Sequence, residues 1–561
     1  MRSARASLGA RRWGWRVALV ALLGCGTGPT PVDPGPEDPG SAVARITLSP
    51  STLTLAPGEV GQFTATVLGP SDAPSTARVL WSSSNPGVAS IDQAGRVTAW
   101  AQGAIQIRAQ AGDLSRTRGV TVSTTPNNLW LARADLIQVA QTASADVPLV
   151  RGKPTAVRLF PQASSLGFTN VPIEVTLSRF DAQLFRATIL SGPIPVATGP
   201  QVGGEGIFLP LPPGLNLEGA LLRARIDPDD LIDERDEWDN YSPTAGELPE
   251  PIVLRDVGAP RIRLVGIAPA GGTPPTIDPG SVDGLAEFMR TVYPTASVEV
   301  TVRTAGIVSA RAWTTRQDLA AALAEVEVQR VADGWAGHYY GVHAQGTVDG
   351  VAGLGYASGR SAIGPFNDVV FAHEVGHNFG LRHAPGCGAT ETNAEYPRPG
   401  GEIGLRGYDA RSGAAVPATA IDLMGYCPGP RWLSGTHFAA MLGAMPSALA
   451  GAALVAAPSG EWAPLAVTAV LGPEGPQTVR AWRLEAAAAF SAAEAGALVE
   501  VLDGTGRVLA TFPVRRQEVA EGGEGAQVVA AILPLTAEVA ARAQGVRVRV
   551  GGESVEAGIG P

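Results

Sequence analysis

Three histidines and a glutamate are grouped within eleven residues, in the segment His373-Glu374-Val375-Gly376-His377-Asn378-Phe379-Gly380-Leu381-Arg382-His383. His373 and His377 are four residues apart, about one helical turn, so both imidazoles face the same side and can share one metal ion. Gly380 can take a positive φ, which lets the chain turn sharply and bring His383 to the same metal. Three neutral imidazoles leave a fourth position for water, which is typical of a catalytic zinc. Glu374 is the natural general base for that water.

A chance origin of this pattern is the alternative to consider. The chain has six histidines and 69 glycines in 561 residues, and the pattern would arise by accident with a probability of roughly 10⁻⁵. A helix with structural histidines is therefore a weak competitor. The other three histidines, His338, His343 and His437, lie in predicted strands or helices, and we expect them to be packing or surface residues.

The histidine pattern resembles the signature of the metzincin clan of zinc endopeptidases. That clan also has a methionine turn beneath the metal, and Asp422-Leu423-Met424-Gly425-Tyr426 matches it, 41 residues after His383. The resemblance implies that Met424 is an apolar floor under the imidazoles. It also implies that Tyr426 approaches the zinc and the transition state, as in astacins and serralysins. In the clan an edge strand pairs with extended substrate, and residues 351–356 are the candidate for this strand.

The chain has only three cysteines, which excludes a disulfide-dense scaffold. Cys387 and Cys427 flank the metal motif and the methionine turn. In an exported protein they would most simply form a disulfide that fixes the turn against the ligand loop. We do not expect either cysteine to bind metal, because the three histidines already supply all the ligands that a protein contributes to a catalytic zinc. No cysteine remains for a thiol latch in a propeptide, so latency by that route is not expected.

The first 25 residues have the features of an export signal. Five arginines precede a short apolar run at 17–23, which is too short to cross a bilayer as a permanent helix. Leu22-Leu23-Gly24-Cys25 resembles the lipobox of bacterial lipoproteins, which implies a lipid on Cys25 and anchoring to the bacterial membrane or cell surface. An ordinary cleaved signal and a secreted protein are the alternative. Residues 26–43 are rich in Gly and Pro, as in a tether.

Composition places limits on the rest of the chain. A length of 561 residues is too great for one hydrophobic core, so several domains are expected. Gly and Pro, 69 and 46 residues, favour short strands and turns. The net charge is -10 and Lys153 is the single lysine, which argues against a nucleic-acid partner.

Two β-rich segments precede the metal motif. Residues 44–124 contain short, evenly spaced strands and resemble bacterial immunoglobulin-like domains of the second group, on the basis of Trp81–Pro86, Ala89–Asp92 and Gly95–Ala99. The pattern of residues 125–257 predicts a second β-sandwich. The end of this segment resembles the end of adhesion-type domains. Eight acidic residues within Asp227–Asp239 could hold a structural Ca²⁺, although a solvated acidic loop is the alternative.

The metal motif lies in a segment with alternating strands and helices, residues 258–452. We expect strands at 262–267, 298–302, 339–343 and 351–356, and helices at 283–292, at 316–331 and from about 367. Residues 457–561 return to a β-pattern and predict a C-terminal sandwich with no chemical motif of its own. The predicted fold class is a multidomain chain, with an α/β metzincin catalytic domain flanked by all-β sandwich domains.

These features predict a zinc endopeptidase with protein or glycoprotein substrates. His373, His377 and His383 would hold the zinc, Glu374 would activate water, and Tyr426 would assist. The alternative is a surface adhesion protein whose degenerate metalloprotease domain no longer cleaves. The intact ligand set and Glu374 argue against it.

Overall fold

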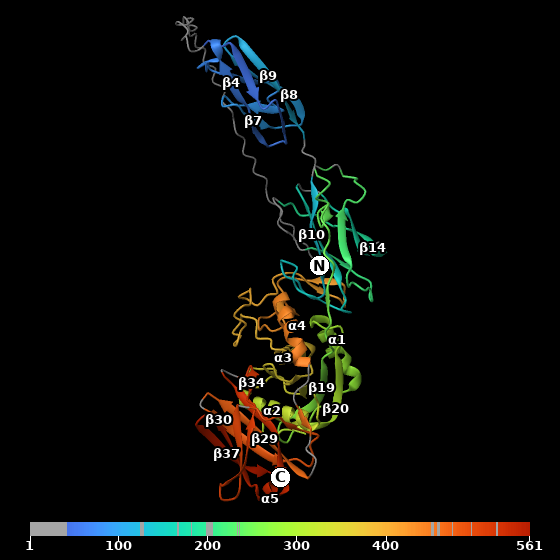
Figure 1. Ribbon diagram of the computed structural model, residues 1–561, viewed down its shortest axis with the longest axis vertical. Coiled ribbons are helices and arrows are strands. Elements are labelled where there is room, and N and C mark those ends of the chain that lie inside the picture. Colours follow the sequence, from blue (N-terminus) through green and yellow to red (C-terminus); the bar gives the residue numbers. More distant parts are fainter. Residues whose placement is uncertain are drawn as a thin grey trace, which may run out of the picture. The chain divides into compact units, whose positions relative to one another are not determined.

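The computed structural model describes residues 42–560, except 124–127, 165–167, 181, 198–205, 233, 235, 450–453, 457–460, 474, 495 and 523–524. Cys25 and the predicted export signal lie outside the described residues. The chain forms two compact units, Met1–Pro126 and Asn127–Pro561 (Figure 1). Within the described part of the chain, no helix is both long and apolar enough to cross a bilayer.

The first unit is a β-structure built from short alternating strands. In β8 every second residue from Ile105 to Ala111 is buried, and these side chains face a core that contains Phe63 and Trp81. The hydrogen-bonded orders are β2-β9-β8-β5, β3-β7-β6 and β1-β4. The strands are β1 (Arg45–Ser49), β2 (Thr52–Leu55), β3 (Val60–Gln62), β4 (Thr64–Leu68), β5 (Leu80–Ser83), β6 (Ala89–Ile91), β7 (Arg96–Ala99), β8 (Gly103–Ala111) and β9 (Leu114–Val122).

The second unit begins with another β-region. Its sheets have the orders β10-β12-β15, β14-β13-β16-β17 and β11-β18. Buried Arg158 donates to both carboxylate oxygens of Asp135, at 2.8 and 2.9 Å, so its charge is paired within this region. The strands are β10 (Leu129–Ile137), β11 (Leu149–Val150), β12 (Ala156–Ala163), β13 (Pro172–Arg179), β14 (Ala182–Leu190), β15 (Ile207–Pro210), β16 (Leu221–Ile226), β17 (Tyr241–Ser242) and β18 (Leu254–Arg255).

The α/β part has three layers. Its parallel strands have the order β20-β19-β21-β23, and β22 is antiparallel to β23. Helices α1 and α3 share one core with this sheet, and α2 shares the core on the other face. The elements are β19 (Arg261–Ala268), α1 (Val282–Val292), β20 (Glu299–Val308), α2 (Arg316–Ala332), β21 (His338–His343), β22 (Leu354–Tyr356), β23 (Ser361–Pro365), α3 (Asp368–Asn378) and α4 (Gly435–Leu449), with two-residue to three-residue strands β24 (Gly407–Asp409), β25 (Ala414–Val416), β26 (Ile421–Asp422) and β27 (Arg431–Trp432).

The expected fold class is confirmed, with differences in detail. Strand β23 was not expected, and β20 continues to Val308 because it pairs with the whole of β19. The strand expected at 351–356 begins only at Leu354, because Val351 pairs back to Val348 in a tight turn.

The C-terminal strands continue the sheet of the α/β part, so that one sheet of thirteen strands runs through both regions. Helix α2 packs against β29 and β35, and the core between them is shared. The C-terminal region is therefore joined to the α/β part by backbone pairing and by apolar packing. Its elements are β28 (Leu454–Ala456), β29 (Trp462–Gly472), β30 (Gly475–Arg483), β31 (Ala489–Ser491), β32 (Ala497–Leu502), β33 (Val508–Val514), β34 (Gln517–Ala520), β35 (Gln527–Thr536), α5 (Ala537–Arg542), β36 (Gly545–Val550) and β37 (Glu553–Gly560).

Candidate active site

Helix α3 positions the first two histidines. It begins after Asn367, whose side chain accepts a hydrogen bond from the Val370 N–H and so satisfies a free donor of the first turn. His373 and His377 lie one turn apart with ring centroids 5.0 Å from each other. The helix ends at Asn378, and two residues later Gly380 takes a φ of +84°, which is easily adopted only by glycine. The chain then reverses and brings His383 next to His377, with their ring centroids 4.7 Å apart.

Each histidine ring is held by a backbone carbonyl. The Nδ1 atom of His373 lies 2.9 Å from the Leu423 carbonyl, that of His377 lies 2.8 Å from Leu381, and that of His383 lies 2.6 Å from Thr390. A carbonyl oxygen only accepts, so each Nδ1 carries the hydrogen. The Nε2 lone pairs of the neutral rings are thus left to bind a metal, and the carbonyls fix the ring orientation.

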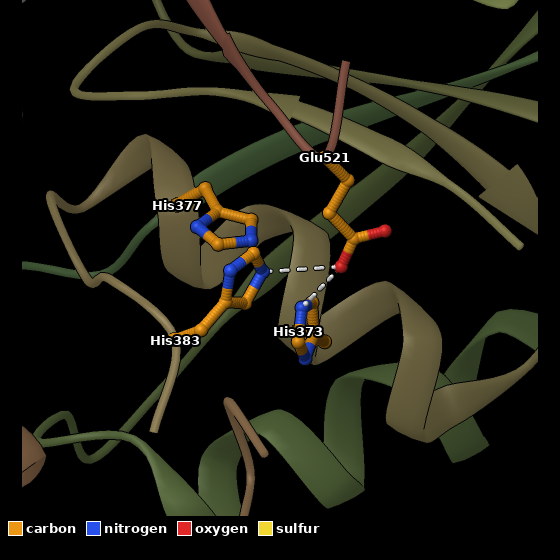
Figure 2. Close-up of side chains that lie close together, drawn as sticks. All are labelled: His373, His377, His383 and Glu521. Carbon is orange, nitrogen blue, oxygen red and sulfur yellow. Dashed lines mark hydrogen bonds and ion pairs between the residues drawn. The ribbon is translucent and has the colours of Figure 1, made fainter. Parts of the chain in front are cut away.

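A fourth side chain, Glu521, completes the cluster (Figure 2). Its Oε1 atom lies 3.0 Å from Nε2 of His373 and 3.2 Å from Nε2 of His383. Glu521 follows β34 and lies in the turn to β35, so it comes from the C-terminal region. The sequence of this region has no recognisable chemical motif, yet the region contributes this side chain to the site. Nothing in the local sequence distinguishes Glu521 from the other acidic residues, because its partners are 138 and 148 positions away.

The donor set fits a zinc ion. One ligand atom from each of the four side chains lies within 4.8 Å of all the others. Two zinc ligands in tetrahedral geometry are about 3.3 Å apart, given bonds of about 2.0–2.1 Å, which agrees with the two contacts of Glu521. Within the described residues Nε2 of buried His377 has no hydrogen-bond partner. Imidazole lone pairs directed at a carboxylate repel it unless a cation lies between them.

Glu374 is buried beside this cluster, with 2% of its surface exposed. Burial, and then the negative charge of Glu521, raise the pKa of Glu374 well above its ordinary value. Gly353 makes room for it, because a Cβ at this position would lie 2.8 Å from Glu374 Oε1. Burial also opposes the ionisation of Glu521, but its contacts with His373 and His383 outweigh burial and lower the pKa of that carboxyl. The two carboxyl groups thus favour opposite protonation states.

The methionine turn is held by Asp422. This buried carboxylate accepts hydrogen bonds from the Met424 N–H at 2.8 Å, from the Ser434 N–H at 2.9 Å and from Nδ1 of His437 at 2.8 Å. Met424 is fully buried and packs against α3, where a Cβ on Gly376 would lie 2.9 Å from its sulfur. His437 is thus a buried residue that fixes Asp422.

Tyr426 and the disulfide lie next to the third histidine. The Tyr426 hydroxyl is 3.4 Å from Nε2 of His383. Burial, followed by the charge of Glu521, raises the pKa of Tyr426, so the phenol keeps its proton. Cys387 and Cys427 form a disulfide with a Cα–Cα distance of 5.1 Å. This bond links the loop after His383 to the residue after Tyr426.

Strand β22 is paired on both sides. Gly355 is opposite Ala362 of β23 and also opposite Ala520 of β34. The residue after β22, Ala357, donates its N–H to the Glu518 carbonyl at 3.0 Å. The expectation of a free edge at 351–356 is therefore wrong for this conformation, because β34 occupies that edge.

The described residues of the acidic segment 227–239 make contacts within the protein. The carboxylate of Asp227 accepts from the N–H groups of Leu231 and Ile232, and Glu234 accepts from Leu129 N–H. Among the described residues, the histidine–glutamate cluster is the only group of three or more His, Cys, Asp or Glu side chains arranged to hold a metal ion. The calcium site stays a prediction.

The α/β fold and the His/Glu site together define a metallopeptidase domain. Residues 295–428 match the reprolysin-like metallopeptidase family M12B, and residues 42–122 match the bacterial Ig-like domain family, group 2. The chain thus contains a reprolysin-like metallopeptidase domain with an intact His/Glu metal site.

Other comparisons add little. No curated protein matches the chain. Domains 4 and 5 of the S-layer protein SbsC are 19% identical over 14% of this chain and 52% of that structure, with a TM-score of 0.14. Three domains of the outer capsid protein Hoc of bacteriophage RB49 are 13% identical over 32% of this chain and 62% of that structure, with a TM-score of 0.14. The chain spans about half of the SbsC structure, and TM-scores this low carry no inference.

Proposed function

We propose that the protein is a zinc endopeptidase that hydrolyses peptide bonds of extracellular proteins or glycoproteins. The observation that carries this proposal is the convergence of three backbone-anchored Nε2 atoms beside the buried carboxyl of Glu374. His373, His377 and His383 would hold the zinc. A zinc ion bound there supplies Lewis-acid polarisation of the scissile carbonyl and makes a nearby water more acidic.

The remaining chemistry belongs to side chains of this chain. Glu374 takes a proton from the attacking water and then delivers it to the departing amine, a role that its buried position beside the three histidines supports. Tyr426 keeps its hydroxyl proton and donates a hydrogen bond to the oxyanion that develops during attack. Met424 and the Cys387–Cys427 disulfide hold the His383 loop and Tyr426 in position.

The location proposed for the enzyme is the cell surface. The match to bacterial Ig-like domains supports an exported protein, and residues 1–25, with Cys25, would provide a lipid anchor; a secreted form is the alternative. In this layout the domains follow the predicted order, namely a tether at 26–43, an Ig-like domain at 44–124, a second sandwich at 125–257, the catalytic domain at 258–452 and the C-terminal sandwich at 457–561. The anchor places the peptidase next to extracellular protein substrates.

Cleavage profiling with a peptide library tests the proposed activity. We expect internal peptide bonds to be cut by the zinc-loaded chain, activity to be lost when a chelator removes zinc, and activity to return with added zinc. Binding of proteins without any cleavage, by the wild-type chain and by variants at the metal site alike, would favour the non-cleaving adhesion protein.

A further inference from the structure

We propose that the β34–β35 hairpin is a built-in inhibitor of this active site, and this inference rests on the proposed peptidase function. Strand β34 occupies the place of an extended substrate along β22. Glu521, at the start of the hairpin turn, takes the fourth ligand position at the metal. The chain is therefore latent in the conformation that the structure shows.

The first argument is the pairing of β34. It lies antiparallel to β22, with Gly355 opposite Ala520 and Tyr356 opposite Val519. Addition of a strand to a sheet edge is a general way to bind an extended peptide, because main-chain hydrogen bonds are independent of sequence. Val519 and Ala520 are buried in this position. A substrate cannot pair with the same edge until β34 leaves it.

The second argument is the position of the Glu521 carboxylate. Oε1 lies between Nε2 of His373 and Nε2 of His383, at 3.0 and 3.2 Å, and the side chain is 7% exposed (Figure 2). With the three histidines as ligands of a bound zinc, this oxygen would be the fourth ligand. Catalytic zinc sites keep one position open, whereas closed sites do not. The attacking water must occupy the space that Glu521 now fills.

The backbone supports a specific role for this side chain. Glu521 has a φ of +65°, a conformation that is uncommon for residues other than glycine. Its neighbour Gly522 would adopt such a φ without strain. A glutamate held in this conformation and buried against two imidazoles is stabilised by its contact with the metal site.

Release requires movement of β34 and of the turn that follows it, and β35 can stay in place. The shared core between the catalytic and C-terminal regions is formed mainly by α2, β29 and β35. By contrast, β34 has four residues and only two registered pairs with β35. Strand β34 and the turn that carries Glu521 can therefore leave the cleft by local opening, while α2 stays packed against β29 and β35.

Three variants of the full zinc-loaded chain test this inference. Glu521→Gln keeps the size of the side chain and removes its charge. Glu521→Gly removes the ligand and suits the left-handed backbone, so this variant is expected to fold. Glu518→Gln is the matched control, because it removes a negative charge from an exposed position of the same strand. Zinc content is measured for each protein.

Two readouts distinguish inhibition by the hairpin, called the latch below, from a catalytic role of Glu521. The first is the affinity for acetohydroxamate, a small zinc-binding probe, measured by calorimetry. The second is kcat/KM for a fluorogenic peptide. If the latch is closed about nine tenths of the time, both Glu521 variants gain about tenfold in probe affinity and in kcat/KM. Glu518→Gln behaves like the wild type.

Other outcomes have definite meanings. Equal probe affinity in all four proteins overturns the latch, whatever their activity. Lower kcat/KM in both Glu521 variants with unchanged probe affinity also overturns it, because Glu521 would then be a catalytic group. Tighter probe binding in the Glu521 variants without peptide cleavage by any protein upholds the latch and contradicts the proposed endopeptidase function.

Discussion

The two β-regions that contact the catalytic domain within residues 128–560 do so through different kinds of contact. The N-terminal one inserts a loop into the catalytic core, where Val139 and Val150 are buried and the Val139 carbonyl accepts from the Trp432 indole N–H at 2.9 Å. Lys153, in the same loop, donates to carbonyls at the end of α1. The C-terminal one extends the catalytic sheet and reaches the metal ligands through Glu521.

The two regions therefore have different effects: the N-terminal one supports the catalytic domain, and the C-terminal one controls access to the metal. Contacts of the N-terminal region lie at the end of α1 and beside Trp432, so they stabilise the domain without reaching the cleft. Among the described residues of these two regions, only the C-terminal region presents a side chain to the histidines. Changes in the first region should therefore alter stability, whereas changes in the second should alter access to the metal.

The largest effect is expected for Glu374→Gln, which tests whether the chemistry belongs to the catalytic helix or to the hairpin. Turnover should fall by about 10²–10⁴-fold, because the amide can neither take nor deliver the proton. Zinc content should not change, since Glu374 is not a ligand. Peptide turnover and metal analysis are the measurements. Full activity in this variant would assign the proton transfer to Glu521 and abolish the distinction between the two regions.

Loss of the disulfide comes next. The Cys387–Cys427 bond closes a loop with a sequence separation of 40, so replacing both residues by serine should lower the free energy of unfolding by about 4 kcal/mol in the chain-entropy account. Denaturant unfolding measures this. The effect should be confined to the catalytic domain, with the first unit melting as in the wild type. An unchanged midpoint would show that packing around Met424 and Asp422 already holds the loop.

Tyr426→Phe should have a smaller effect, confined to turnover. The ring keeps its packing and loses the donor near the oxyanion, which typically costs about 10²–10³ in kcat, or about 2.7–4 kcal/mol. KM and zinc content should stay close to wild type. Steady-state kinetics with metal analysis provide the test. Unchanged turnover would mean that Tyr426 only packs beside His383, leaving zinc and Glu374 as the catalytic groups.

The sequence predicted those parts of the site that depend on local geometry. The four-residue spacing of His373 and His377 requires only a helix, and Gly380 marks the turn that returns His383. Glu521 could not be predicted in this way, because its position depends on the pairing of β34 with β22 across more than 130 residues. The joining of two predicted domains into one sheet escaped prediction for the same reason, since strand periodicity does not specify a partner.

Lys153 provides the last test, on the supporting side of the comparison. Its ammonium nitrogen is buried, 3.1 Å from the Thr291 carbonyl and 3.4 Å from that of Thr295, and burial lowers the pKa of Lys153 to about 7 from 10.5. Above this pH the folded chain loses the proton while the unfolded chain keeps it. The unfolded state then binds more protons, so the free energy of unfolding rises with pH.

Between pH 7 and pH 9 this linkage should add about 2 kcal/mol to the wild-type stability. Lys153→Met keeps the aliphatic stem and removes the titrating group, so its stability should be flat over the same interval, apart from changes that both proteins share. Denaturant midpoints at the two pH values measure the difference. Peptide kcat/KM at a single pH should be nearly the same for the two proteins, because Lys153 supports α1 and does not reach the cleft. Parallel stability profiles would mean that the carbonyls around the ammonium keep it charged, while a large change in kcat/KM would show that the N-terminal region also controls the active site.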